Sequence, residues 1–137
     1  MKIFVQIASY RDPQLVPTLK DMIANAKRPK NLVFSIARQF NETDGFDNLD
    51  EFRKDKRFKI MDIPYQGSRG VCWARNMTQQ LYDGEEYTLQ IDSHMRFAKD
   101  WDDILIKMIK GLQKDGYKKP LLAGYVPSFD PENDIHR

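Results

Sequence analysis

Asp92 and His94 are the residues of this sequence whose types and spacing most directly suggest chemistry. One residue, Ser93, separates them, and on an extended segment their side chains point to the same side with Cα atoms roughly 6.6 Å apart. A carboxylate and an imidazole placed in this way can bind one divalent cation, and the mixed pair suits Mn²⁺ or a similar borderline ion. Phosphate oxygens and water would complete the coordination. The alternative is that Asp92 caps a turn and His94 is an ordinary surface residue.

A second candidate site is the loop Gly67–Gly70 together with the helix expected after it. Free backbone N–H groups and the helix dipole make such a junction a natural place for an anion. Arg75 lies early in that helix, and its planar guanidinium can contact a phosphate through two nitrogens. The loop matches neither the P-loop nor the G-x-G-x-x-G pattern. The alternative is a plain loop followed by a solvated arginine.

Ser9, Tyr10 and Arg11 place a hydroxyl, an aromatic ring and a cation in a row at the end of an apolar segment. This combination suits contact with a nucleotide base or a ribose. The sequence has no G-x-S-x-G motif, and His94 and His136 are its two histidines, so the pattern disfavours a hydrolase triad.

Regular elements must position these side chains, and the hydropathy pattern predicts strands and helices in alternation. Five short apolar runs predict strands at Ile3–Ser9, Leu32–Ala37, Phe58–Ile63, Tyr87–Asp92 and Leu121–Val126. Three segments with helical spacing predict helices: one that starts at Asp12-Pro13 or only at Pro17, one over Val71–Tyr82, and one over Trp101–Leu112 that Asp100 can cap.

Strands that alternate with helices are typical of an α/β fold with a mainly parallel sheet flanked by helices. Ligands of such sheets bind outside the carboxyl ends of the strands. The segments that end strands are therefore the ones to inspect: Ser9–Asp12, Arg38–Gln39, Pro64–Gly70 and Asp92–His94.

Length and composition predict one globular domain over residues 1–137, with 41% hydrophobic and 31% charged residues. The net charge of +2 disfavours a dedicated nucleic-acid or anionic-membrane binder. One cysteine, Cys72, excludes an internal disulfide and a cysteine-based zinc site. No apolar run approaches the length of a membrane span, and no signal-peptide pattern is present, so the expected location is the cytoplasm.

Three stretches carry a resemblance to a known family: FVQIASYRDPQLVPTLKDMIANAKRPKNL, GVCWARNMTQQLYDGEEYTLQIDSHMRFAKDWD and LLAGYV. Together they resemble the glycosyltransferase family of the cytoplasmic hydroxyproline N-acetylglucosaminyltransferases, which are of the GT-A type. The resemblance covers nearly the whole chain. The sequence is also similar to the mucin-type polypeptide GalNAc transferases. Like them, it has an Asp-x-His motif and an arginine about 17 residues before the aspartate, here Arg75 and Asp92.

The resemblance implies a role for each candidate residue. Asp92 and His94 would hold Mn²⁺ against the diphosphate of UDP, and Arg75 would contact the donor. Ser9, Tyr10 and Arg11 would lie near the uridine, and Ser93 would line the sugar or ribose. The family retains anomeric configuration, so no single general base is expected, and the metal would stabilise the UDP leaving group.

The implied activity is transfer of a sugar, GlcNAc by resemblance, from UDP-sugar to a hydroxyl group of a protein or glycan. Enzymes of the GT-A type usually continue well beyond the fifth strand, so we expect a donor-binding part that lacks the acceptor half. Apolar surface left uncovered in such a part would favour self-association. The alternative is a nucleotide-sugar-binding protein without transfer activity.

Overall fold

The computed structural model describes residues 1–116, so the strand expected at Leu121–Val126 lies outside the described residues. The chain forms two compact units. The first, which we call the sheet unit, comprises Met1–Lys20 and Lys30–Met95. The second, which we call the helical unit, comprises Asp21–Pro29 and the chain from Arg96 onwards.

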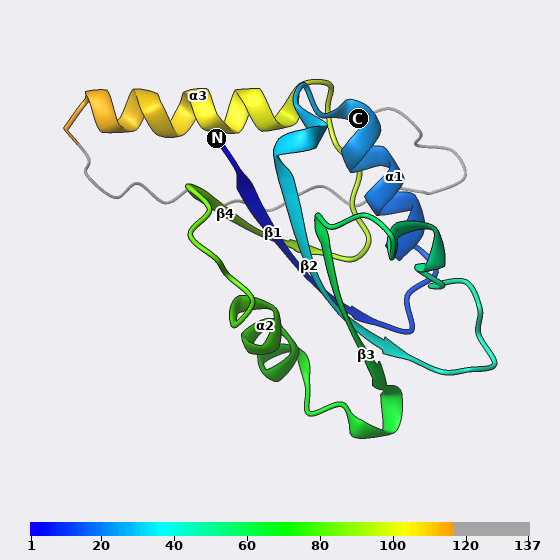
Figure 1. Cartoon of the computed structure of the whole chain (residues 1–137). Coiled ribbons are helices and arrows are strands. Elements are labelled where there is room, and N and C mark those ends of the chain that lie inside the picture. The colour runs from blue at the N-terminus through cyan, green and yellow to red at the C-terminus, as the bar shows by residue number, and fades with distance from the viewer. Residues whose placement is uncertain (117–137) are drawn as a thin grey trace. The chain divides into compact units, whose positions relative to one another are not determined.

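The sheet unit is built on four parallel strands (Figure 1). Their order across the sheet is β3-β2-β1-β4, so β1 lies between β2 and β4. The strands are β1 (Ile3–Tyr10), β2 (Leu32–Phe40), β3 (Phe58–Pro64) and β4 (Tyr87–Asp92). The chain moves from β1 outward to β3 and then returns to the other side of β1. This change of direction places a topological switch point between β1 and β4, where parallel sheets bind their ligands.

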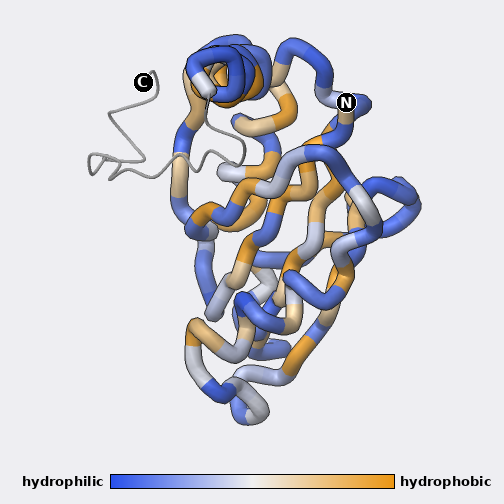
Figure 2. The backbone as a smooth tube through the Cα atoms, turned by 90° about the vertical axis from the view of Figure 1, so that its left-hand side faces the viewer, coloured by the Kyte–Doolittle hydropathy of each residue, from blue (hydrophilic) through white to orange (hydrophobic). Residues whose placement is uncertain are grey.

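The two central strands are almost continuously apolar, as expected for strands that are covered on both faces. Hydrophobic residues therefore concentrate along the middle of the sheet (Figure 2). The stacked rings of Phe34, Phe58 and Phe52 extend this core past β3, with centroid separations of 4.5 and 4.8 Å. The fully buried hydrophobic residues of the strands are Phe4, Val5, Ile7, Leu32, Phe34, Ile36 and Ala37.

Helix α1 (Leu15–Asn25) begins between the two starting points that the sequence offers. Asp12 and Pro13 precede it in a turn, in which Asp12 Oδ1 accepts a hydrogen bond from the Gln14 N–H (2.8 Å). Pro17 falls within the first helical turn, where backbone N–H groups have no partner inside the helix, so its missing N–H costs nothing there. The expectation that the regular helix starts at Asp12-Pro13 or at Pro17 is thus wrong by a few residues.

Helix α2 (Val71–Gln79) follows a short 3₁₀ turn at Tyr65–Gly67 and packs against β1 and β2. Gly70 joins the two with φ 96° and ψ 172°, a conformation that is essentially restricted to glycine. A Cβ atom at this position would meet no other atom within 4 Å. Glycine is therefore required here because of the backbone conformation, and not because a side chain would clash with neighbouring atoms.

The helical unit contains α3 (Trp101–Lys114), whose first turn carries two buried aspartates. The carboxylate of Asp102 accepts hydrogen bonds from the backbone N–H groups of Lys27 and Arg28, at 2.7 and 2.9 Å. The indole Nε1 of Trp101 donates to the carbonyl of Met22 (2.8 Å). Asp100 occupies the N-cap position as predicted, but in the left-handed conformation and without a side-chain capping bond, so the expected capping role is wrong.

The other strands and helices expected within residues 1–116 agree with the structure to within a few residues at their ends. An α/β fold with a parallel sheet and flanking helices is confirmed. No helix within residues 1–116 has the length and apolar character that a membrane crossing requires.

Candidate functional site

The candidate site lies at the carboxyl ends of β1, β2 and β4. In the sheet register Ala8 pairs with Asp92, and Tyr10 pairs with Gln39. The segments that continue from β1 and β4, which contain Asp12 and His94, therefore leave the sheet at its switch point. This is the edge at which the sequence predicts ligand binding.

Arg75 and Asp92 come from different elements and form an ion pair. The guanidinium Nη2 of Arg75, on α2, lies 3.4 Å from Oδ1 of Asp92, at the end of β4. Both side chains are about half exposed, at 41% and 50%. A ligand at this edge can therefore reach the cation and the carboxylate together.

His94 contacts a carboxylate other than that of Asp92. Its Nδ1 lies 2.9 Å from Oδ2 of Asp12, which also accepts a hydrogen bond from the Ser93 hydroxyl (2.6 Å). The imidazole is 60% exposed, whereas the Asp12 side chain is only 14% exposed. The structure thus adds Asp12, to which the sequence assigns no chemical role, to the candidate site.

Ser9, Tyr10 and Arg11 occupy three different environments. The Ser9 side chain is fully buried, and its hydroxyl has no hydrogen-bond partner among the described residues. Tyr10 is 54% exposed. Arg11 has a left-handed backbone with φ 46°, unusual for a non-glycine residue and often found at functional sites.

The Arg11 guanidinium is engaged within the sheet unit. It forms an ion pair with Asp44 (2.8 Å) and lies over the ring of Tyr65, 5.0 Å from its centroid. Hydrogen bonding between the two side chains raises the pKa of Arg11 and lowers the pKa of the Asp44 carboxyl. Of these three predicted residues, Tyr10 is the one whose side chain is most available to a ligand.

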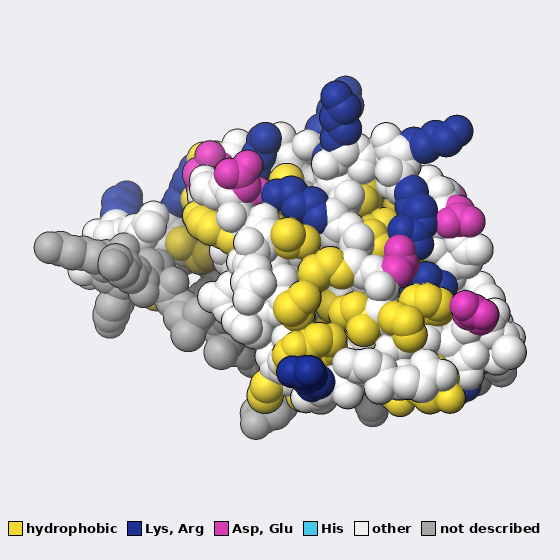
Figure 3. Space-filling model, turned by 60° about the horizontal axis from the view of Figure 1, so that its bottom comes forward, with side chains coloured by type: hydrophobic (Ala, Val, Ile, Leu, Met, Phe, Trp, Pro, Cys, Tyr) yellow, Lys and Arg dark blue, Asp and Glu magenta, His cyan; other side chains and the backbone are white. Residues whose placement is uncertain are grey.

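A shallow cleft of about 280 Å³ opens beside Tyr10. Gln39 and Ser68 line it, and neither was assigned a role from the sequence, although both lie in strand-end segments. The Gln39 amide donates to the Ser9 carbonyl (3.0 Å) and accepts a hydrogen bond from the Ser68 hydroxyl. Figure 3 shows hydrophobic side chains gathered in the middle of one face, with Lys and Arg around them. The cleft is lined by Ala8, Tyr10, Gln39, Ser68, Gly70 and Val71.

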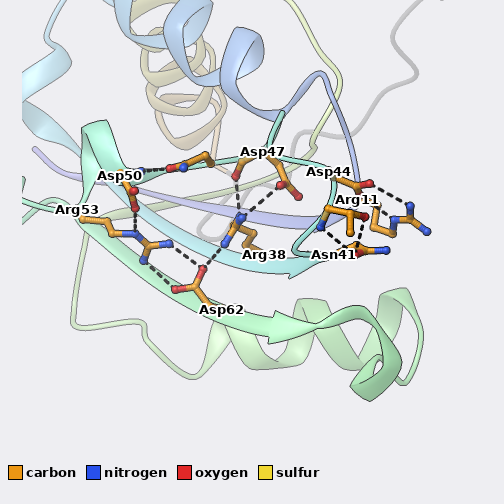
Figure 4. A network of polar contacts seen from close by, with 10 residues as sticks. Arg11, Arg38, Asn41, Asp44, Asp47, Asp50, Arg53 and Asp62 are labelled. Atoms are coloured by element: carbon orange, nitrogen blue, oxygen red, sulfur yellow. Dashed lines mark hydrogen bonds and ion pairs between the residues drawn. The ribbon is translucent and has the colours of Figure 1, made fainter.

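A network of charges fixes the chain between β2 and β3 (Figure 4). Arg38 forms ion pairs with the carboxylates of Asp47 (3.3 Å) and Asp62 (2.8 Å), and its Nε donates to the Asp47 carbonyl (2.6 Å). Arg53 binds the same Asp62 carboxylate through both terminal nitrogens (2.8 and 2.9 Å). Hydrogen bonds from Arg53, and then from Arg38, lower the pKa of Asp62. The network thus links β2 and β3 to the segment between them and supports this side of the sheet.

The comparisons with known proteins identify the family. The family model described as "Glycosyltransferase (GlcNAc)" matches residues 2–56 and 46–137. The chain therefore belongs to the GlcNAc glycosyltransferase family. No curated protein matches the sequence.

The structure is similar to the crystal structure of S. aureus TarS 1-349, with a TM-score of 0.64 and 18% sequence identity. The match covers 81% of this chain and 33% of the TarS chain. The chain thus shares the fold of about a third of the TarS chain, and the predicted glycosyltransferase-like α/β fold is confirmed.

Proposed function

We propose that this chain binds a UDP-sugar at the carboxyl edge of its sheet and acts as the donor-binding part of a glycosyltransferase. The observation that carries the proposal is the contact of Arg75 with Asp92, two residues before His94, at the switch point of a sheet in a chain of this family. Helix α2 supplies Arg75, a cation that can bind phosphate. The end of β4 and the segment after it supply Asp92 and His94, two groups that can bind a metal.

A divalent cation, Mn²⁺ or a similar ion, is part of the proposal, and the available donors suit it. Asp92 offers an exposed carboxylate oxygen, and His94 keeps Nε2 available because Asp12 occupies Nδ1. No group of three His, Cys, Asp or Glu side chains within residues 1–116 forms a metal site by itself. Asp92 and His94 would therefore share the ion with diphosphate oxygens and water. When bound, the ion would stabilise negative charge on the UDP leaving group.

The protein's own residues would bind and orient the donor. Arg75 would move from Asp92 toward the diphosphate, where its planar guanidinium can contact two oxygens. Tyr10 would offer an aromatic face to the uridine, and Ser9 and Arg11, its neighbours in the sequence, would lie nearby. Ser93 would contribute its backbone near the sugar or ribose, because its side chain is buried and bound to Asp12.

The resemblance and the family description support GlcNAc as the donor sugar. The resemblance alone supports a hydroxyl group of a protein or glycan as the acceptor. The same resemblance supports retention of anomeric configuration, hydroxyproline as the acceptor to test first, and the cytoplasm as the location.

Calorimetric titration of UDP and UDP-GlcNAc, with and without Mn²⁺, tests donor binding. We expect binding that depends on Mn²⁺, and we expect Asp92→Asn to weaken it by more than about tenfold, or about 1.4 kcal/mol, because a charged ligand is lost. Asp83→Asn is the matched control, since Asp83 is exposed and precedes the amino end of β4, whereas Asp92 ends this strand. UDP affinity that is indifferent to EDTA and to Asp92→Asn would overturn the metal assignment.

Transfer is a separate step and needs its own assay. Release of UDP from UDP-GlcNAc that requires a hydroxyproline peptide would support transfer. Binding without any acceptor-dependent release would support the alternative, a nucleotide-sugar-binding protein without transfer activity.

A further inference from the structure

The Asp12 carboxylate connects the start of α1 to the segment that follows β4. One oxygen, Oδ1, accepts a hydrogen bond from the Gln14 N–H (2.8 Å). The other, Oδ2, accepts from the Ser93 hydroxyl at 2.6 Å and lies 2.9 Å from Nδ1 of His94. Asp12 and His94 are 82 positions apart in the sequence, so this contact is made by the fold.

The contact determines which nitrogen of His94 carries hydrogen. An ionised carboxylate has only acceptors, so Nδ1 must be the donor in the pair. In the neutral ring, the lone pair then lies on Nε2. A neutral imidazole whose N–H is held by a carboxylate is the arrangement that commonly orients a metal-binding histidine.

Thr18 fixes the backbone of the same short segment. Its hydroxyl donates to the Ser93 carbonyl (3.0 Å) and lies 3.0 Å from the Met95 N–H, which donates to it. Thr18 is fully buried, so water does not compete for these bonds. The residues on both sides of His94 are thus bound to α1, while its ring is attached to Asp12.

We propose that Asp12 is a positioning residue that holds His94 in the Nδ1–H form and presents Nε2 to the metal, with Thr18 fixing the backbone around it. The inference rests on the proposed function, because the metal is the Mn²⁺ of the donor site. It assigns a role to an aspartate that would not touch the metal, the nucleotide or the sugar.

The first test is the tautomer of His94 in the metal-free protein. Long-range ¹H–¹⁵N correlation at pH about 8.5, where an ordinary imidazole is neutral, distinguishes the two forms. The chain has two histidines, and His94→Gln identifies the signals of His94. We expect the Nδ1–H form in the parent chain and a shift toward the Nε2–H form in Asp12→Asn, since an amide can also donate at this position. The Nε2–H form in the parent would overturn the inference, whether or not the variant folds.

The second test is Mn²⁺ affinity, measured from the electron paramagnetic resonance signal of free Mn²⁺. We expect Asp12→Asn to weaken Mn²⁺ binding by about tenfold or more. The Asp83→Asn control should leave affinity and tautomer unchanged. Unchanged affinity in folded Asp12→Asn would overturn the inference and leave the proposed function standing. No Mn²⁺ binding by the parent chain, with or without UDP, would instead overturn the metal site of the proposed function.

Discussion

Arg75 forms an ion pair with Asp92 that a bound ligand would replace under the proposed function. In the structure its guanidinium neutralises part of the charge of Asp92 across 3.4 Å, at a half-exposed position where the pair contributes little to stability. A diphosphate would bring more negative charge to the same place. Because the pair is weak, Arg75 can exchange its partner without a large cost.

We predict that Arg75→Ala weakens UDP-sugar binding by about tenfold or more, since it removes a charge-assisted contact to phosphate. Arg75→Lys should restore little of this loss, because an ammonium group cannot make the planar two-nitrogen contact. Calorimetric titration with Mn²⁺ present measures both variants. Arg57→Lys is the matched control, because Arg57 directly precedes the amino end of β3 and so lies away from the carboxyl ends of the strands. If both Arg75 variants bind like the parent, Arg75 is a surface residue without a donor role.

The sequence predicted which residues lie at the carboxyl ends of the strands better than it predicted their contacts. Strand ends and residue types singled out Tyr10, Arg75, Asp92 and His94 as candidates, and in the structure they lie at the carboxyl ends of the strands or contact a residue there. The contact of Asp12 with His94 was missed because the proline after Asp12 suggests a helix start. A contact between residues so far apart in sequence depends on strand order, which local patterns do not contain.

At the scale of elements, the junction before α2 depends on one glycine. Gly70 has a backbone conformation that other residues rarely adopt, and it immediately precedes the helix that carries Arg75. Gly67, three residues earlier, has no such positive φ, and a Cβ there would lie in ordinary contact with Ile63, at 3.8 Å. The two glycines therefore allow a matched comparison within one loop.

We predict that Gly70→Ala lowers the free energy of unfolding by about 1–3 kcal/mol, because alanine is strained at this φ and ψ. Gly67→Ala should have a smaller effect or a slightly stabilising one, since alanine restricts the unfolded chain. Urea unfolding followed by circular dichroism measures both. Equal effects of the two substitutions would show that backbone strain at Gly70 is not the determining factor.

Helix positions were predicted well where apolar spacing defines them and less well at their ends. The apolar spacing located α1 and α3, but Pro17 and Asp100 misled the assignment of starts and caps. Proline is tolerated throughout the first turn, so it does not mark the first helical residue. An aspartate before a helix caps it only in a suitable backbone conformation, and Asp100 is left-handed.

At the scale of the molecule, the alternation of strands and helices was enough to predict a parallel α/β fold. It was not enough to predict the order β3-β2-β1-β4 or the two compact units, because both depend on contacts between distant segments. The family model matches sequence from both units. The site itself lies within the sheet unit.

The stability of the molecule should fall at acid pH, because several carboxylates that are bound to arginines in the folded state become protonated there. Hydrogen bonds from arginine lower the pKa of one carboxyl in the helical unit and of three in the sheet unit. A lowered pKa means that the unfolded chain binds more protons as the pH falls, so the stabilisation is present above the ordinary pKa of about 3.9 and is lost below it. The four carboxyls are Asp44, Asp55, Asp62 and Asp103.

Asp62 provides the sharpest test of this dependence, because Arg53 and Arg38 both bind it. We predict that the melting temperature of the parent chain falls as the pH is lowered from about 5 to about 2, and that Asp62→Asn melts lower than the parent at neutral pH. The difference between the two should shrink as the pH falls, since asparagine has no proton to take up and the parent loses its ion pairs. Thermal unfolding by circular dichroism at a series of pH values measures this, with Asp83→Asn as the charge-matched control. A difference that stays constant over the whole range would mean that Asp62 acts through packing and not through its charge.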